Sequence, residues 1–168
     1  MNPLDTPIGF SSTFLFVPAT RPERFAKALD SGADGVIIDL EDAVAQEDKE
    51  SARTAIRAAW PSFTTEQKKR LIIRSNSPGS HFYAADLILV QELDVACLLI
   101  PKSESLDQIN GAAQILPNTA IIPMIETAIG LDRLNEIANS EQVLRLALGN
   151  IDLQADLGMV CDAQETEL

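Results

Sequence analysis

The sequence predicts an α/β fold built on a parallel sheet, and three observations lead to that prediction. Short apolar runs rich in Val, Ile and Leu alternate with longer segments whose apolar residues recur at helical spacing. The last four runs begin about 25 residues apart, as parallel strands joined by helical crossovers would. Each run is followed closely by a polar or charged residue. Continuous apolar runs of this kind are typical of strands that are buried on both faces.

The first two strands are expected at residues 14–17 (FLFV) and 35–40 (GVIIDL). Pro18 stops the first strand, and Pro22 suits the first position of the helix that follows it. Gly32 ends this helix. The chain is therefore expected to begin with a complete strand–helix–strand unit.

The second helix is expected from about residue 48 to residue 60, because its alanines and isoleucine fall on one face. Asp48 or Ser51 is its candidate cap, and Pro61 is its stop. Residues 71–74 (LIIR) form the third strand, and the turn-rich sequence SNSPGS follows it.

A helix through residues 83–90 precedes the fourth strand, which is expected at residues 96–100. Ser103 or Ser105 caps the next helix. The fifth strand, residues 120–125 (AIIPMI), is too short for a helix and ends abruptly at an acidic residue.

After the fifth strand, apolar residues at helical spacing across residues 128–138 predict an amphipathic helix. Residues 144–148 are the sixth expected strand, and the tail beyond residue 158 has no strong pattern. Six units are visible, whereas a closed (β/α)8 barrel typically has about 250 residues. The pattern alone fits either a barrel that lacks two units, with helices on one face, or a doubly wound sheet with helices on both.

Length, charge and cysteine content indicate to which broad class of protein this sequence belongs. A chain of 168 residues is expected to form a single domain, residues 1–168, with a substantial core. The net charge of −12 argues against nucleic acid or an anionic membrane as a partner. The sequence has neither a membrane-spanning run of about 18 apolar residues nor a signal-peptide pattern. Cys97 and Cys161 make no disulfide framework, so we expect a cytoplasmic protein, with Cys97 as a small buried hydrophobe.

Polar side chains follow every expected strand, at the end where α/β folds build their active sites. Any one of them could equally be a helix cap or a solvated loop charge, but six strands in a row make that interpretation less attractive. The candidate residues are Arg21, Glu41, Asp42, Arg74, Asn76, Lys102, Glu126, Asn150 and Asp152.

Glu126 and Asp152 follow neighbouring strands and could share a divalent cation. Carboxylate oxygens with few other ligands suit Mg²⁺, with Mn²⁺ as an alternative. Zinc is disfavoured because the chain has one histidine, His81, which we interpret as a surface residue. Arg74 offers a planar fork for a substrate carboxylate, and Lys102 a point charge beside an anion. No Gly-rich phosphate loop occurs.

Six motifs, in order, resemble those of the citrate lyase β subunit and its relatives in the HpcH/HpaI aldolase group, which includes malyl-CoA and citramalyl-CoA lyases. They are FLFVPATRPERFAKA, DGVIIDLEDAV, IIRSN, IPK, PMIETAIG and LALGNIDLQADLG, and they extend from about residue 12 to 158. Each motif is weak when taken singly, but the ordered series is specific. The resemblance implies a TIM-type barrel, here with about six of eight units, in a homo-oligomer, with a trimer favoured.

The resemblance also implies a reaction, the reversible cleavage of a β-hydroxy acyl thioester into an α-keto acid and an acyl thioester of CoA or acyl carrier protein. It places Glu126 and Asp152 on the two Mg²⁺-binding carboxylates and Arg74 on the arginine that grips the keto-acid carboxylate. Glu41 and Asp42 fall on an acidic pair that closes the site, and Lys102 on the lysine of a Pro-Lys motif. Glu41 is the candidate acid/base group. The alternative is a non-catalytic, shortened homologue that binds metal and keto acid or serves as an assembly partner.

Overall fold

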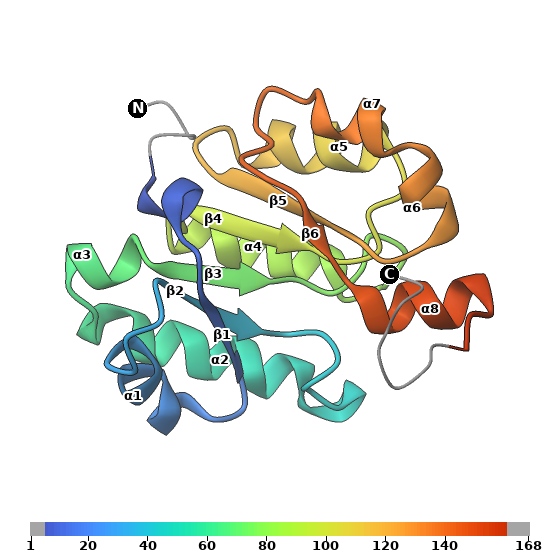
Figure 1. Ribbon diagram of the computed structural model, residues 1–168. Helices are drawn as coiled ribbons and strands as arrows, with labels where there is room; N and C mark the ends of the chain where they lie inside the picture. The colour runs from blue at the N-terminus through green and yellow to red at the C-terminus, as the bar shows by residue number, and fades with distance from the viewer. Residues whose placement is uncertain (1–5, 161–168) are drawn as a thin grey trace.

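The computed structural model describes residues 6–160. Strands and helices alternate along this part of the chain (Figure 1). The strands are β1 (Phe14–Pro18), β2 (Gly35–Asp39), β3 (Leu71–Arg74), β4 (Cys97–Ile100), β5 (Ala120–Ile125) and β6 (Ala147–Leu148). The α-helices are α1 (Phe25–Leu29), α2 (Lys49–Ala59), α3 (Thr65–Lys68), α4 (Tyr83–Glu92), α5 (Leu106–Ile115), α6 (Ala128–Asp132), α7 (Leu134–Ala138) and α8 (Asn150–Leu157). Four 3-10 turns complete the elements: η1 (Pro7–Phe10), η2 (Pro22–Arg24), η3 (Gln46–Asp48) and η4 (Trp60–Ser62).

The six strands form one parallel sheet in the order β1-β2-β3-β4-β5-β6, so every strand pairs with its neighbours in the sequence. This simple order, with helical crossovers between parallel strands, is that of a (β/α) barrel. The sheet curls into a half-barrel (Figure 1). The predicted α/β fold with six of eight barrel units is confirmed.

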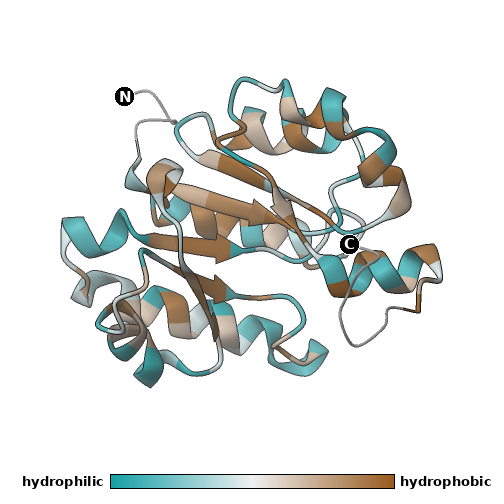
Figure 2. Cartoon of the chain, in the orientation of Figure 1, coloured by the Kyte–Doolittle hydropathy of each residue, from teal (hydrophilic) through white to brown (hydrophobic). Residues whose placement is uncertain are grey.

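The two faces of the sheet are covered differently, and this distinguishes a barrel from a doubly wound sheet. Alternate strand residues such as Val36, Ile38 and Ile73 pack with the helices into one large apolar cluster. The residues between them form a smaller cluster to which no described α-helix contributes; its buried members are Ile8, Ile37, Ile72, Cys97, Leu99, Ala120, Ile122 and Met124. In Figure 2 the strands are largely hydrophobic (brown), whereas the helices carry both hydrophilic and hydrophobic residues. The helices therefore lie on one face, as in a barrel.

Local sequence signals explain where several helices begin. Ser105, rather than Ser103, caps α5: its side chain accepts from the Gln108 amide, and the Gln108 side chain accepts from the Ser105 amide. Asp48 stands at the N-cap of α2 but makes no side-chain capping bond, because η3 leads directly into that helix. Cys97 is fully buried, as predicted, whereas Cys161 lies outside the described residues.

Three sequence predictions were wrong in detail. The helix expected across residues 128–138 is two short helices, α6 and α7, because Arg133 between them leaves the helical region. The sixth strand has only two residues. Ile121 pairs with Val143 and Met124 pairs with Ala147, so the segment before β6 contains one residue more than the opposite part of β5, and this extra residue interrupts the ladder. Helices α3 and α8 were not predicted, although Thr64 and Gln67 form a capping box that marks α3.

The edge strands β1 and β6 each pair with one neighbour within the part of the chain that the structure describes. Leu15 and Phe16 of β1 and Leu148 of β6 are substantially exposed. Between these edges, a cavity of about 290 Å³ opens on the concave face of the sheet. Among residues 6–160, no helix is long and apolar enough to cross a membrane.

Candidate active site

The site lies at the carboxyl end of the sheet, where the alternation of the strands places charged residues on the concave face. Inward-facing Ile37 is followed two residues later by Asp39, and inward-facing Ile72 by Arg74. Asp39 and Arg74 are register partners on β2 and β3. Asp39 was not predicted as a site residue, because Glu41 and Asp42 directly follow the predicted strand and mark its tip. The alternation within GVIIDL was the signal that could have identified it.

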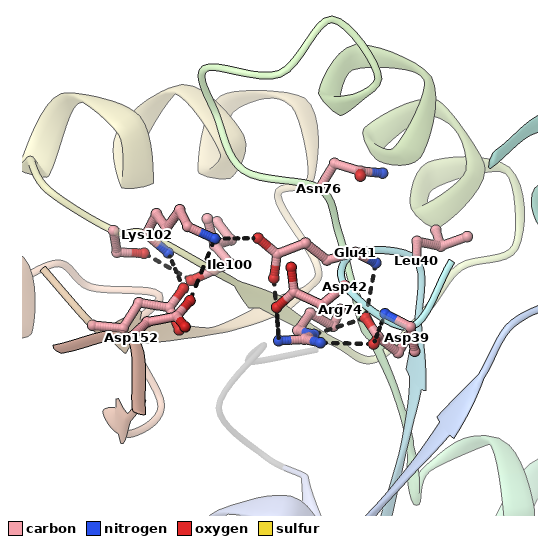
Figure 3. Close-up of polar contacts among 12 residues, drawn as sticks. Asp39, Leu40, Glu41, Asp42, Arg74, Asn76, Ile100, Lys102 and Asp152 are labelled. Atoms are coloured by element: carbon pink, nitrogen blue, oxygen red, sulfur yellow. Dashed lines mark hydrogen bonds and ion pairs between the residues drawn. The ribbon is translucent and has the colours of Figure 1, made fainter. Parts of the chain in front are cut away.

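Arg74 is the centre of an ion-pair network (Figure 3). Its Nε and Nη2 donate to the two carboxylate oxygens of Asp39 at 2.7 and 2.6 Å. Its Nη1 lies 3.1 Å from Glu41 Oε2 and 3.5 Å from Asp42 Oδ2. Asp39 and Glu41 are buried, whereas the Asp42 side chain is 61% exposed. The Nε–Nη2 edge of the guanidinium is therefore already occupied, which leaves Nη1 as the nitrogen that Asp39 does not engage.

Lys102 connects this network with the carboxylates on the other side of the site. Its Nζ donates to Glu41 Oε1 at 2.9 Å and lies 3.6 Å from Asp152 Oδ2. Its backbone amide donates to Glu126 Oε1 at 2.8 Å. Lys102 has a φ of 47°, a left-handed conformation that is unfavourable for a residue with a Cβ. Such strain concentrates at functional sites, and here it directs the amide toward Glu126.

Asp152 and Asn150 follow the sixth strand, as predicted, and belong to the first turn of α8, a helix that the sequence did not predict. They line a cavity of about 400 Å³ together with Glu126, Asp42 and Arg74. The start of α8 thus brings one carboxylate to the cavity that also holds the carboxylate at the end of β5. The predicted convergence of the strand ends is observed for these residues.

Gly149 allows Glu126 to occupy this position. A Cβ built on Gly149 would lie 2.7 Å from Glu126 Cβ and in direct overlap with Glu126 Oε2. The φ of −94° at Gly149 is accessible to any residue, so space rather than backbone conformation requires glycine here. Gly149 was not singled out from the sequence, and its motif LALGNID gave no sign of this contact.

Burial dominates the electrostatics of the acidic residues. Burial raises the pKa of Glu41 above its ordinary value, and the hydrogen bond from Lys102 and the charge of Arg74 only partly offset this effect. The pKa of Glu126 is also raised, first by burial and further by the neighbouring charges of Glu41 and Asp152. Burial acts to lower the pKa of Lys102, but its hydrogen bond to Glu41 and the surrounding carboxylates raise it. Glu126 lines the 400 Å³ cavity, and Glu41 contacts Arg74, which also lines it. Acids with raised pKa values in such positions are typical of a functional site.

The donor set fits Mg²⁺. Glu126 and Asp152 offer hard carboxylate oxygens on one cavity, and Mg²⁺ characteristically uses one or two protein carboxylates while keeping several waters or substrate oxygens. Residues 6–160 contain no group of three or more His, Cys, Asp and Glu side chains arranged to enclose a metal. A zinc-type cage is therefore not built in this part of the chain.

The site carries an excess of negative charge. Two cationic side chains, Arg74 and Lys102, face a larger number of carboxylates, and a bound divalent cation would offset most of the difference. The carboxylates concerned are Asp39, Glu41, Asp42, Glu126 and Asp152.

A second polar network, formed by residues of α2 and α4, holds the loops that follow β2 and β3 from the helix side of the sheet. Asp86 is fully buried and accepts from Arg53 Nη1 at 2.8 Å and from both the amide and the side chain of Asn76 at 2.7 Å. The predicted site residue Asn76 is thus held toward the helix layer. Buried Lys49 donates to the carbonyls of Leu40 and Glu41 at 2.6 Å. Sequence reasoning missed Asp86, Arg53 and Lys49, which lie inside helices α2 and α4 where charge usually means a solvated face.

Two other residues considered from the sequence lie outside the network. Arg21 is half-exposed at the start of η2 and pairs with Glu23 at 2.6 Å. His81 is exposed and packs against the ring of Phe82, with 3.8 Å between the ring centroids. The interpretation of His81 as a surface residue is confirmed, whereas Arg21 follows β1 but makes its ion pair with Glu23 and not with the network around Arg74.

Known proteins resemble this chain over most of its length. The sequence pattern of the HpcH/HpaI aldolase/citrate lyase family matches residues 12–168. A citrate lyase subunit beta-like protein of Mycobacterium tuberculosis is 38% identical over 145 residues, which are 86% of this chain and 50% of that protein. A (3S)-malyl-CoA thioesterase of Cereibacter sphaeroides is 31% identical over 144 residues, again 86% of this chain and 50% of the relative. The chain spans about half the length of these curated relatives.

The fold is also similar to a solved structure. The citrate lyase beta subunit of M. tuberculosis in complex with oxaloacetate and magnesium superposes with a TM-score of 0.81 at 34% sequence identity. The similarity covers 98% of this chain and 69% of that one. The half-barrel therefore has the arrangement of the corresponding part of that structure.

Proposed function

Because this chain belongs to the HpcH/HpaI aldolase/citrate lyase family, we propose that it is a Mg²⁺-dependent carbon–carbon lyase. Its substrate would be a β-hydroxy acyl thioester of the citryl or malyl type, carried on CoA or acyl carrier protein. The products would be an α-keto acid such as oxaloacetate or glyoxylate and an acyl thioester. The observation that carries this proposal is the meeting of Glu126, Asp152 and Arg74 on one cavity. The magnesium and oxaloacetate in the M. tuberculosis structure support it.

Glu126 and Asp152 would hold the metal, with Mn²⁺ as a possible substitute. When bound, the cation would act as a Lewis acid at the substrate hydroxyl oxygen, on the carbon that becomes the carbonyl of the keto acid. Gly149 and the Lys102 amide keep the Glu126 carboxylate in place for this task. Asp152, at the start of α8, keeps part of its side chain exposed and so can complete the coordination.

Three further side chains would act on the substrate. Arg74 would bind and orient it, Lys102 would add a positive charge beside it, and Glu41 would move its proton. Arg74 lines the cavity, and its Nη1 would bind the keto-acid carboxylate and so fix the orientation of the reacting carbon. Glu41 would accept the proton of the substrate hydroxyl as the carbon–carbon bond breaks and its electron pair passes to the acyl thioester. The pKa of Glu41 is raised and so lies closer to neutral pH than that of an ordinary carboxyl, which suits a group that must both take and return a proton.

The charge of the site predicts that metal binds before the keto acid. Arg74 and Lys102 are outnumbered by carboxylates, so an anionic ligand would be repelled from the metal-free site. A divalent cation between Glu126 and Asp152 would remove most of this repulsion. Oxaloacetate binding should therefore depend strongly on Mg²⁺.

A second candidate is a protein that binds metal and keto acid without turnover, or that acts as an assembly partner. The exposed edge residues Phe16 and Leu148, which line the 290 Å³ cavity on the concave face, favour this candidate, because exposed apolar side chains on a strand edge suit contact with another chain. We expect these edges to be covered in a homo-oligomer, with a trimer favoured. Light scattering on the purified chain measures the number of subunits.

An assay with malyl-CoA, with and without Mg²⁺, separates these functions. A lyase releases glyoxylate and acetyl-CoA without a free thiol, whereas a thioesterase releases malate and free CoA thiol. A binding protein yields neither, but still shows Mg²⁺-dependent stabilisation by oxaloacetate. Citryl-CoA tests the other substrate type, and Glu126→Ala is the control. Turnover that persists in Glu126→Ala, or in the presence of a chelator, would contradict the proposal.

A further inference from the structure

Asp39 has an unusual position for a residue that lies beside a substrate-binding arginine. It is the last residue of β2, is 1% exposed, and does not line the 400 Å³ cavity. Its register partner across the sheet is Arg74. A carboxylate this deeply buried is retained only if its oxygens are fully engaged, because desolvation of an unpaired charge costs several kcal/mol.

The Asp39 oxygens are divided between two tasks. Oδ1 accepts from Arg74 Nε at 2.7 Å and from the Glu41 amide at 2.8 Å. Oδ2 accepts from Arg74 Nη2 at 2.6 Å and from the Ala43 amide at 3.1 Å. One carboxylate therefore fixes both the guanidinium of Arg74 and the loop that carries Glu41 and Asp42.

The remaining contacts of Arg74 define which part of the guanidinium is available. The cation lies 5.2 Å from the centre of the Phe16 ring on β1, which supports one side of the group. Nη1 faces Glu41 at 3.1 Å and the exposed side chain of Asp42 at 3.5 Å. Asp42 is thus the weakest competitor at Nη1, since its side chain is 61% exposed and its distance is the longest of the Arg74 ion pairs.

We propose that Asp39 is a positioning residue that holds Arg74 by its Nε–Nη2 edge, so that the keto-acid carboxylate binds at Nη1 and replaces Asp42 there. This inference rests on the proposed function and specifies its anion subsite. The sequence suggested that the planar fork of Arg74 binds the substrate carboxylate, but its Nε and Nη2 bind Asp39 instead. The substrate carboxylate would bind at Nη1.

The test measures oxaloacetate affinity by isothermal titration at saturating Mg²⁺ in the wild type, Asp39→Asn, Arg74→Gln and the double variant. Asp39→Asn keeps the shape of the side chain but loses one acceptor and the charge, so we expect oxaloacetate to bind about tenfold more weakly or worse. In the Arg74→Gln background, Asp39→Asn should have no further effect. Mg²⁺ affinity, measured separately, should change less than threefold, because Glu126 and Asp152 lie on other elements.

Asp39→Glu replaces Asp39→Asn should the latter fail to fold, because it keeps the charge while moving the carboxylate by one methylene. It too should weaken oxaloacetate binding severalfold. Asp34→Asn, at the opposite end of β2, is the matched control and should bind as the wild type does. Unchanged oxaloacetate affinity in a folded Asp39 variant, or an equal loss in the Arg74→Gln background, would overturn the inference alone. A wild type that binds no oxaloacetate with Mg²⁺ would overturn the proposed function and this inference together.

Discussion

Two arginine–carboxylate networks lie close together in this molecule, and they differ in how completely they are satisfied. The Arg53–Asp86 pair is almost inaccessible, with side chains 5% and 0% exposed, and both Asp86 oxygens accept hydrogen bonds. Arg53 also pairs with the exposed side chain of Glu50 at 2.8 Å, so the difference lies in the buried carboxylate oxygens. The Arg74 network includes Asp42, which is mostly exposed, and Glu41 Oε2, a buried oxygen with an ion-pair contact but no hydrogen bond. A buried carboxylate whose two oxygens both accept hydrogen bonds forms a closed network that stabilises the fold, whereas a buried oxygen without a hydrogen bond near a cavity retains capacity for a ligand.

The largest effect is expected where the closed network is broken. Asp86→Ala leaves Arg53 Nη1 without its buried acceptor, although Nε and Nη2 keep their bonds to Glu50, and it removes both hydrogen bonds to Asn76. We therefore expect a loss of about 3 kcal/mol in the free energy of unfolding. Glu92→Ala, which removes a half-exposed partner of Arg57, is the control and should cost less than about 1 kcal/mol. Urea denaturation measures both. Similar losses in the two variants would contradict the claim that the buried contacts of Asp86 stabilise the fold more than a half-exposed ion pair does.

Removal of a metal carboxylate should instead leave the metal-free fold intact. Glu126→Gln replaces a buried acid, whose charged form is disfavoured by burial, with a neutral group of the same shape. The wild type should gain about 2.7 kcal/mol of stability at a Mg²⁺ concentration 100 times the Kd, and the variant should gain almost none. Thermal denaturation with and without Mg²⁺ measures this difference. A variant that Mg²⁺ stabilises as strongly as the wild type would rule out Glu126 as a ligand.

The fit between Gly149 and Glu126 gives a smaller and more local prediction. Gly149→Ala places a methyl group against the Glu126 carboxylate, so we expect Mg²⁺ to bind about tenfold more weakly, or about 1.4 kcal/mol. Gly111→Ala in α5 has free space around the added methyl and should stabilise the protein by about 0.5–1 kcal/mol without changing Mg²⁺ affinity. Calorimetric titration of Mg²⁺ distinguishes the two. Equal metal affinity in both variants would show that Glu126 tolerates the methyl group.

The smallest effect concerns pH. Burial raises the pKa of Glu41 above 4.5, so its contribution to stability is fully present below pH 4.5 and is lost as the pH rises through the raised pKa. In metal-free buffer, Glu41→Gln should therefore become progressively more stable than the wild type as the pH increases across this range. Denaturation midpoints at several pH values measure the difference. A difference that shrinks with rising pH would mean that Arg74 and Lys102 outweigh burial.

The strands could be predicted from the sequence because their signal is local. Residues 71–74 and 120–125 are apolar runs with clear ends, and the structure assigns strands with the same bounds. The edge strand at residues 144–148 was less predictable, because its ladder depends on the neighbour β5 and on an extra residue opposite it. Helix α8 follows it without an apolar stripe that would have indicated a helix.

The site was predictable to the extent that it follows strand ends. Glu41, Arg74 and Lys102 each come directly after an apolar run, and the parallel sheet brings them together. The role of Asp39 depends on which face of the sheet it occupies and on its register with Arg74, which single runs do not reveal. The left-handed backbone of Lys102 and the contact of Gly149 with Glu126 likewise arise from tertiary packing rather than from local pattern.

The most direct test of the proposed site is isothermal titration of oxaloacetate into the chain, with and without Mg²⁺, on a sample whose size is defined by light scattering. The charge and geometry of the site predict saturable binding in the presence of Mg²⁺ and none that is measurable in its absence. Equal binding with and without the metal, or no binding in either condition, would contradict the claim that Glu126, Asp152 and Arg74 form one functional site.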